Sequence, residues 1–177
     1  MTLTLLVLAM IAAANPFRAL AARPPGATGE TVMAALTATM VLAWISAVLS
    51  GPLLDLVDVS GPNARIAAGI ALLVVALKDV FAAPPTAEPA LTGWRAGVVP
   101  LAFPVIFSPA LALLAVAGAA ERGVALALTA TAIALVPVAL ALSVAPAMRR
   151  VRAMTTFTGA LGTGVAALVV LDGIYAI

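Results

Sequence analysis

The chain contains neither cysteine nor histidine among its 177 residues. This absence excludes disulfide bonds, thiol chemistry, Cys/His metal sites, imidazole general bases and Ser-His-Asp triads. The 6 methionines are scattered rather than paired, so they do not indicate a pathway for soft metal ions. We therefore expect no enzyme active site, no metal site and no cofactor.

Charge is also scarce, because only 9% of the residues are charged, against about 25% in soluble proteins. The 9 Lys and Arg and the 7 Asp and Glu are too few to form the basic stripe that nucleic-acid recognition requires. Hydrophobic residues make up 64% of the chain, against roughly 45–50% in soluble domains. This composition excludes nucleic acid as a partner and places the chain in a lipid bilayer.

The apolar residues fall into six segments that are separated by proline, glycine and polar residues. A spanning helix needs roughly 20 apolar residues, so six spans leave room only for short loops. No basic residue precedes the first segment, which we therefore interpret as a span rather than a signal peptide. We predict an all-α membrane protein with a single transmembrane domain, residues 1–177, whose six transmembrane helices cover residues 2–22, 31–51, 60–81, 94–120, 123–144 and 154–177.

Lys and Arg are divided unequally between the two sides that these spans define. Basic loops are retained in the cytoplasm during insertion. One side carries only Arg65 and Arg122, so we expect this side, with both termini, to face outward. The other side carries Arg18, Arg23, Lys78, Arg95, Arg149, Arg150 and Arg152.

The two halves of the chain share landmarks when residue i is set against residue i+93. The matching landmarks are Asn15-Pro16 with Ser108-Pro109, Gly69 with Gly162, and Asp79 with Asp172. They define repeat one, residues 1–83, a linker, residues 84–93, and repeat two, residues 94–177, with three spans in each repeat. An odd number of spans inverts the second repeat across the membrane, as in many secondary transporters. A chance match is the alternative, because Ala, Leu and Val dominate both halves.

Pro16 and Pro109 lie well inside the first and fourth spans. Proline has no N–H and clashes with the preceding turn, so carbonyls near residues 12 and 105 lose their helical donors. Such broken backbone is tolerated in a bilayer only against protein or a wet cavity. We expect two proline-broken helices that meet at a midplane site, to which Asn15 and Ser108 contribute hydrogen-bonding groups. The alternative is two kinks that a neighbouring helix satisfies.

Arg18 follows the first break by one turn, and two interpretations of it stay open. Its guanidinium either points into a cavity at the break, where it would attract an anion, or extends to the cytoplasmic interface. Asp79 and Asp172 are expected near the cytoplasmic and outer ends of their spans, as coupling residues or as interfacial acids. Because they lie on opposite sides, they cannot form one catalytic acid–base pair.

Arg65 and Asp79 lie on nearly one face of the third span, about four turns apart, with Gly69 between them. Small residues on such a face let helix backbones approach closely. We expect this face to pack on the sixth span, within one chain or between the subunits of a homodimer. The corresponding face of the sixth span carries Thr155, Thr158, Gly162, Ala166 and Asp172.

Residues 99–110, with the sequence VPLAFPVIFSPA, resemble the P-L-A-x-P-x-x-x-G-P-x-A signature of the MarC family of integral membrane proteins. Residues 65–70 are similar to the family's R-I-A-G-G start of the third span, and residues 171–174 to its L-D-G end of the sixth. The chain departs from the family at Ser108, where glycine is usual, and at Asn15, where an acidic D-P is common. The missing acid weakens the case for a cation or proton site at the first break.

The resemblance implies a six-span protein of the bacterial inner membrane, related to the LysE-like superfamily of exporters and lipid-addressing proteins. We predict a secondary transporter or exporter of a small anionic or zwitterionic solute. The alternative is a non-transporting, lipid-binding or assembly subunit of a membrane complex. The predicted substrate-binding residues are Asn15, Pro16, Arg18, Ser108 and Pro109, and the predicted coupling or packing residues are Arg65, Gly69, Asp79, Thr158, Gly162 and Asp172.

Overall fold

The computed structural model describes residues 1–82, 91–144 and 148–177, and these residues form helices and short connections without any strand. The first predicted break, at Asn15-Pro16, and the second, at Ser108-Pro109, are both present. Most of the predicted linker, and the Ala145-Pro146 turn, lie outside the described residues. The elements are α1 (Leu3–Ala14), α2 (Pro16–Ala21), α3 (Gly29–Val48), α4 (Ser50–Leu56), α5 (Gly61–Phe81), α6 (Gly93–Ala96), η1 (Gly97–Ile106), α7 (Pro109–Arg122), α8 (Val124–Ser143) and α9 (Met148–Ile174).

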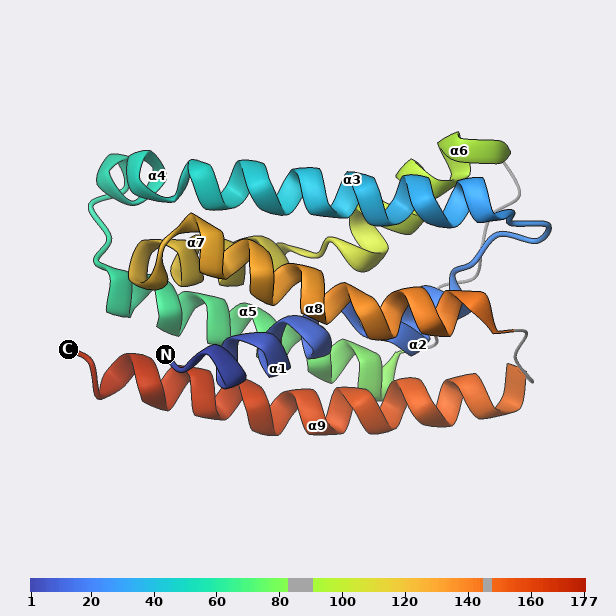
Figure 1. Cartoon of the computed structure of the whole chain (residues 1–177). Coiled ribbons are helices and arrows are strands. Elements are labelled where there is room, and N and C mark those ends of the chain that lie inside the picture. The colour runs from blue at the N-terminus through green and yellow to red at the C-terminus, as the bar shows by residue number, and fades with distance from the viewer. Residues whose placement is uncertain (83–90, 145–147) are drawn as a thin grey trace.

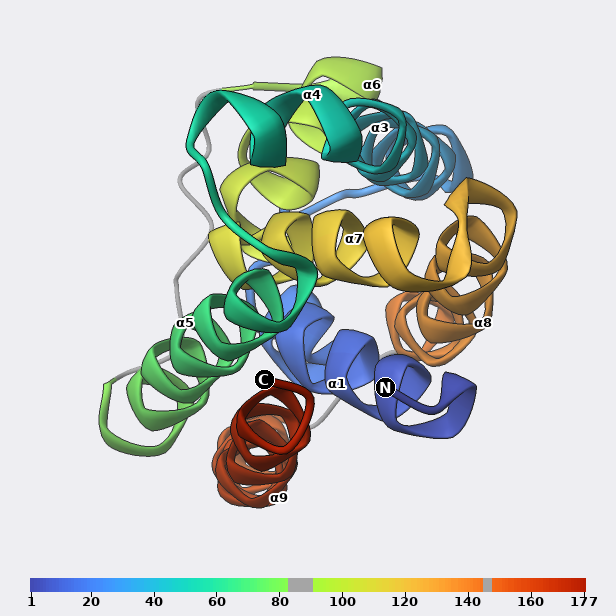
Figure 2. The ribbon, with the colours of Figure 1, turned by 90° about the vertical axis from the view of Figure 1, so that its left-hand side faces the viewer.

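The helices form a bundle in which the two broken segments are central and the continuous helices are peripheral. Figure 2, which looks along the bundle, places α1 and α7 in the middle and α3, α5, α8 and α9 around them. The buried share is 61% in the α1–α2 segment but only 28% in α3. The surface of the outer helices is apolar, with large exposed side chains such as Trp44, Val74 and Phe157. Such a surface suits contact with lipid rather than water.

Among the described residues, four stretches are long and apolar enough to cross a membrane, and a bent pair adds a fifth. The bent pair joins residues 93–106 to α7 at an angle of 71°. α5 is as long as these stretches but carries Arg65, Lys78 and Asp79, and it is not among them. The all-helical class is confirmed for the described residues, and four or five candidate spans agree with a multi-pass membrane protein, whereas the sixth span and the inverted repeats stay predictions. The four single stretches are Leu3–Ala21, Gly29–Val48, Val124–Ser143 and Arg150–Ile174.

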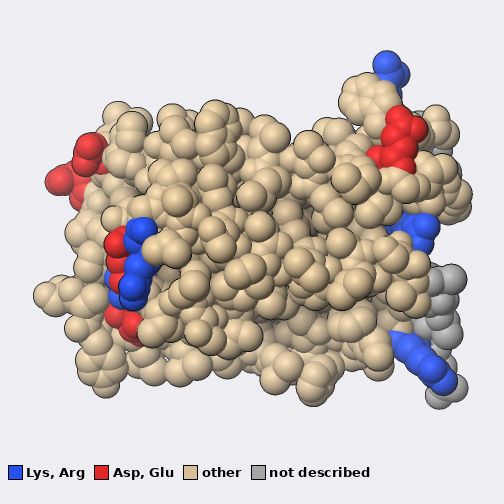
Figure 3. All heavy atoms as spheres, in the orientation of Figure 1, with Lys and Arg blue, Asp and Glu red and all other residues tan. Residues whose placement is uncertain are grey.

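Both chain termini lie at one end of the bundle, which we call the terminal end (Figure 1). The opposite end, where α2 and α5 finish and α9 begins, is the basic end, because Arg23, Lys78, Arg95, Arg150 and Arg152 belong to the segments there. On the face in Figure 3, charged side chains are confined to these two ends, and an uncharged band separates them. This distribution is typical of a protein that exposes its ends to water and its middle to lipid.

The connection between α3 and α5 differs from the prediction. Gly51-Pro52 was expected to end the second span and begin a loop. Instead α3 ends at Val48, and both residues lie within the short helix α4. Proline is tolerated there because the first-turn N–H groups of a helix have no intrahelical partner.

The helices α5 and α9 pack along their lengths through small residues. A methyl group built on Gly69 would lie 2.7 Å from Val170 Cγ2 and 3.0 Å from the Val170 backbone nitrogen. One built on Gly162 would lie 3.1 Å from Ala76 Cβ. Both glycines are therefore packing residues that allow α5 and α9 to approach closely, as small residues do between membrane helices.

We predict that Gly69→Ala lowers the free energy of unfolding by about 1–3 kcal/mol, the usual cost of overpacking. The expected measurement is thermal unfolding of the detergent-solubilised protein. Gly164→Ala is the matched control, because a methyl group at Gly164 on α9 meets no atom within 4 Å. Equal melting temperatures for the two variants would contradict the close α5–α9 contact.

Candidate functional site

A cavity of about 420 Å³ lies between the C-terminal part of α5, the irregular helix η1 and the two helix breaks. Its volume is within the range of small-molecule sites. Charged and hydroxyl side chains share its wall with apolar ones. The lining residues are Arg18, Val75, Lys78, Asp79, Ala82, Pro104, Val105, Ser108, Pro109 and Thr155.

The first break is built by Asn15, which is fully buried. Its backbone has φ 32° and ψ 96°, a conformation with positive φ that asparagine tolerates better than most residues. Its side-chain oxygen accepts hydrogen bonds from the backbone N–H groups of Phe17 (3.2 Å) and Arg18 (3.3 Å), so it caps α2. Pro16 fits at the first position of α2 because it has no N–H to satisfy. Because the N–H groups of Phe17 and Arg18 bond to the Asn15 side chain, they do not bond to carbonyls of α1. The Ala13 carbonyl accepts hydrogen bonds from the side chains of Arg18 and Ser108 instead.

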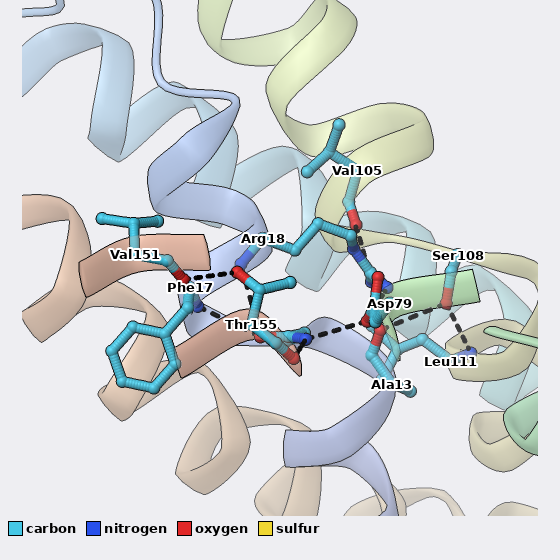
Figure 4. Close-up of polar contacts among 10 residues, drawn as sticks. Ala13, Phe17, Arg18, Asp79, Val105, Ser108, Leu111, Val151 and Thr155 are labelled. Carbon is cyan, nitrogen blue, oxygen red and sulfur yellow. Dashed lines mark hydrogen bonds and ion pairs between the residues drawn. The ribbon is translucent and has the colours of Figure 1, made fainter. Parts of the chain in front are cut away.

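The second break is built by Ser108 and Pro109. Ser108 Oγ accepts a hydrogen bond from the Leu111 N–H at 3.4 Å and caps α7, in which Pro109 is the first residue. The same hydroxyl donates to the Ala13 carbonyl at 3.4 Å, which joins the two breaks (Figure 4). Because Pro109 has no N–H, the Val105 carbonyl four residues earlier lacks a helical donor.

Arg18 supplies the donors that both breaks lack. Its Nε and Nη2 donate to the Val105 carbonyl at 3.2 and 2.9 Å, and Nη2 also donates to the Ala13 carbonyl. Its Nη1 pairs with Asp79 Oδ2 at 2.8 Å. The residue is only 8% exposed, so it is not an interfacial anchor. Of the two interpretations of Arg18, the structure favours the guanidinium that points toward the break.

Asp79 connects α5 to the two breaks, because its buried carboxylate pairs with Arg18. Asp79 Oδ2 accepts a second hydrogen bond, 2.8 Å long, from Asn15 Nδ2. The same amide also donates, at 3.4 Å, to the carbonyl of Thr155 on α9. One charged pair therefore connects four helices, α1, α2, α5 and η1 (Figure 4). Charge-assisted hydrogen bonds of this kind are stronger than neutral ones.

A second charged cluster lies at the terminal end. Arg65 Nη2 pairs with Glu121 at 2.8 Å, and Arg65 Nη1 pairs with Asp172 at 2.5 Å. The amino group of Met1 contacts both acids, and Arg122 Nε donates to the Met1 carbonyl at 2.9 Å. Arg65 Nε is a buried nitrogen without a hydrogen-bond partner among the described residues. The cluster ties α5 to the ends of α7 and α9.

The structure brings together all five predicted substrate-binding residues, but it separates the predicted coupling and packing residues. Asp79 joins the cavity, whereas Arg65 and Asp172 pair at the opposite end of the bundle. Thr158 is half-buried on α9 and does not line the cavity, whereas Thr155, which the sequence placed on the same face, does. The five residues that meet at the breaks are Asn15, Pro16, Arg18, Ser108 and Pro109.

The sequence did not indicate the positions of two charged residues, one at the cavity and one in the terminal cluster. Lys78 was only counted among the basic residues of the cytoplasmic side, yet it lines the cavity next to Asp79. Glu121 was not singled out, yet it pairs with Arg65. No local pattern signals the second contact, because it depends on how the last turn of α7 meets α5.

We predict that Arg18→Gln destabilises the protein by roughly 3–5 kcal/mol, because it leaves the Asp79 carboxylate buried without a cation. The double variant Arg18→Gln with Asp79→Asn should recover most of this loss, since no buried charge then remains. Thermal unfolding of the single and double variants in detergent measures the coupling free energy between Arg18 and Asp79.

The matched control is Arg95→Gln, because Arg95 is exposed and its guanidinium lies over the Trp94 ring at 5.6 Å. Its effect should stay within about 0.5 kcal/mol, as for most surface substitutions. A double variant no more stable than Arg18→Gln would contradict an energetic coupling between Arg18 and Asp79.

Comparison with known proteins found no relative of this chain. Any function assigned to the chain therefore depends on its own residues and their arrangement. No family model matches the chain, and neither does any curated protein or any solved structure.

Proposed function

We propose that the protein is a secondary transporter or exporter of a small anionic or zwitterionic solute. The observation that supports this function best is the buried Arg18–Asp79 pair at a cavity between two broken helices. Ionisable groups inside a membrane bundle are costly and usually mark a substrate or ion path. Broken helices offer unpaired backbone groups and helix ends to a polar solute.

The proposed architecture has six spans. The sixth is α5, whose charged residues make it less apolar than the other candidate spans. Its three charged residues face protein partners or the ends of the bundle: Arg65 pairs at the terminal end, Asp79 pairs with Arg18, and Lys78 lies one turn from the end of the helix. α5 can therefore cross a bilayer without exposing a charge to the middle of the hydrocarbon. Six crossings agree with the two termini at one end of the bundle (Figure 1).

The spans form two inverted repeats in this proposal. An offset of 93 residues places the last residue of α5, Phe81, on the last residue of α9, Ile174. It also places α3 within two residues of α8 at both ends. Figure 1 supports the inversion, because α5 runs toward the basic end and α9 runs away from it. The halves differ at the first span of each, where the regular helix α1 corresponds to the irregular η1.

Membership of the MarC family, a bacterial inner-membrane location and termini outside the cytoplasm are parts of the same proposal. The family signature in residues 99–110 covers the second break, where Val105 and Ser108 contact the first break. The basic end faces the cytoplasm in this orientation, in keeping with the retention of basic loops there.

A non-transporting role has one observation in its favour. The nitrogens of the Arg18 guanidinium already bond to Asp79, Val105 and Ala13, so the group is satisfied without a ligand. A lipid-binding or assembly subunit could use such a centre to hold the bundle together. Co-purification with stoichiometric lipid or a protein partner, without solute movement in liposomes, would support this second function.

We predict that purified protein in liposomes moves a small radiolabelled carboxylate or zwitterion, with acetate, succinate and alanine as class probes. Asn15→Ala should reduce this movement at least about tenfold, because Asp79 and the cap of α2 both lose a hydrogen bond worth roughly 1.5–3 kcal/mol. Ser108→Ala should act in the same direction. Initial uptake rates measure the effect, and size-exclusion chromatography checks that each variant is folded.

The matched control is Thr129→Ala. Thr129 is exposed on α8, and among the described residues its hydroxyl bonds only to the Ala125 carbonyl of its own helix. This variant should transport at the native rate. Normal transport by folded Asn15→Ala and Ser108→Ala proteins would show that the breaks are not the solute site.

A further inference from the structure

The charges that line the cavity are unequal. Arg18 and Lys78 are basic and Asp79 is the acidic residue on the wall formed by the described residues. Arg18 and Asp79 neutralise each other at 2.8 Å. No acid of the described residues pairs with Lys78, which is exposed on the same wall. The described residues of the wall therefore carry a net positive charge, and low-dielectric walls concentrate the field of such a charge.

The Asp79 carboxylate already indicates which chemical group suits this centre. A single carboxylate oxygen, Oδ2, accepts from Arg18 Nη1 and Asn15 Nδ2, each at 2.8 Å. Two donors that converge on one oxygen recognise carboxylate and phosphate groups in general. An incoming oxyanion can use the same donors when Asp79 moves away. It then replaces the negative charge that Asp79 withdraws, and Lys78 offers it a second cation.

We propose that the cavity binds its solute through an oxyanion group, a carboxylate or a phosphate, which takes the place of the Asp79 carboxylate on Arg18 and is completed by Lys78. This inference rests on the proposed function and narrows its solute to a net anion. Asp79 then acts as a built-in competitor that keeps Arg18 neutralised when the solute is absent. An unpaired buried guanidinium would otherwise be strongly destabilising.

A zwitterion fits the cavity less well than an anion. A zwitterion adds no net charge, so it would leave the charge of Lys78 unbalanced among the described lining residues, whereas a net anion balances it. The ammonium group of a zwitterion would share the cavity with the cations Arg18 and Lys78, and like charges repel each other. The rest of the wall is apolar at Val75, Pro104 and Pro109, which suits the carbon body of a small organic anion.

The charge of the cavity can be measured without knowledge of the solute, because the natural chain has no cysteine. Ala82 lines the cavity and is exposed, so Ala82→Cys provides one reactive thiol there. Its rates with an anionic and a cationic methanethiosulfonate reagent are measured. Each is divided by the rate at which the same reagent reacts with free 2-mercaptoethanol in solution, which corrects for the intrinsic reactivity of the reagent. We expect the anionic reagent to be favoured several-fold.

Lys78→Gln should remove this preference, whereas Arg95→Gln, the same change of charge on an exposed residue, should leave it intact. Preference for the cationic reagent, or equal effects of Lys78→Gln and Arg95→Gln, would overturn the inference. If the thiol reacts without any preference for the anion, the oxyanion inference fails while an aqueous cavity, and with it the proposed function, stands.

Competition with Asp79 is tested by protection of the Ala82→Cys thiol from the neutral reagent N-ethylmaleimide. Sodium phosphate and sodium acetate are the probes, and choline chloride at equal ionic strength is the control. Asp79→Asn should lower the half-protecting concentration about tenfold, because one charge-assisted competitor, equivalent to about 1.4 kcal/mol, is removed. Lys78→Gln should raise it.

Weaker or unchanged protection in folded Asp79→Asn protein would show that Asp79 binds the solute instead, and would overturn the inference. If Asp79→Asn does not fold, the exposed Lys78→Gln variant decides the question alone. Its half-protecting concentration must then rise above that of Arg95→Gln for the inference to stand.

Two arms distinguish the source of the oxyanion. In phosphatidylcholine vesicles, protection by added phosphate or acetate indicates a free solute. In vesicles that also contain phosphatidylglycerol, protection without added anion indicates a lipid headgroup. Either result supports the oxyanion site, and the absence of protection in every arm overturns it.

Discussion

The structure depends on how the Arg18 guanidinium is satisfied inside an apolar bundle. Two prolines remove helical hydrogen bonds in neighbouring segments, and this one side chain donates to a carbonyl at each break, Ala13 and Val105. Its positive charge is balanced by Asp79, which α5 contributes. A bilayer offers no water to backbone groups in its interior, so broken helices persist there only where protein groups replace the lost donors. The breaks, the charged pair and the position of α5 are therefore parts of one arrangement.

Within the part of the chain that the structure describes, charged contacts join the helices differently at the two ends of the bundle. At the terminal end, Arg65, Glu121 and Asp172 join α5, α7 and α9 in one charged cluster. Toward the basic end, the Arg18–Asp79 pair is the link between α2 and α5, and the cavity lies beside it. Access to the centre from the basic end is therefore expected to need less rearrangement than access from the terminal end. A transporter that opens to one side at a time requires such an asymmetry.

The sequence allowed much of this fold to be predicted, because proline and glycine in apolar segments have few structural alternatives. The breaks at Pro16 and Pro109, the boundaries of α5 and the close packing at Gly69 follow from local rules. The short helix α4 was missed because Gly51-Pro52 indicates a turn as readily as a helix start. The number of spans is not settled by composition alone, since the three charges of α5 reduce its resemblance to a membrane helix.

The partners of the charged residues were beyond prediction from the sequence. Arg18 and Asp79 are 61 residues apart, and Arg65 and Asp172 are 107 residues apart. Such pairs depend on the relative rotation and depth of whole helices, which no local pattern encodes. For the same reason the sequence placed Lys78 among the basic residues of the cytoplasmic side without indicating that it lines the cavity.

The most direct test of a water-filled centre is a single cysteine at position 108, probed with a membrane-impermeant thiol reagent from each face of oriented vesicles. Ser108 lines the cavity and contacts the first break, so its replacement reports on the centre itself. We expect labelling from the face at the basic end and none from the face at the terminal end, where the Arg65 cluster closes the bundle. Labelling from neither face, or only from the terminal end, would contradict the account.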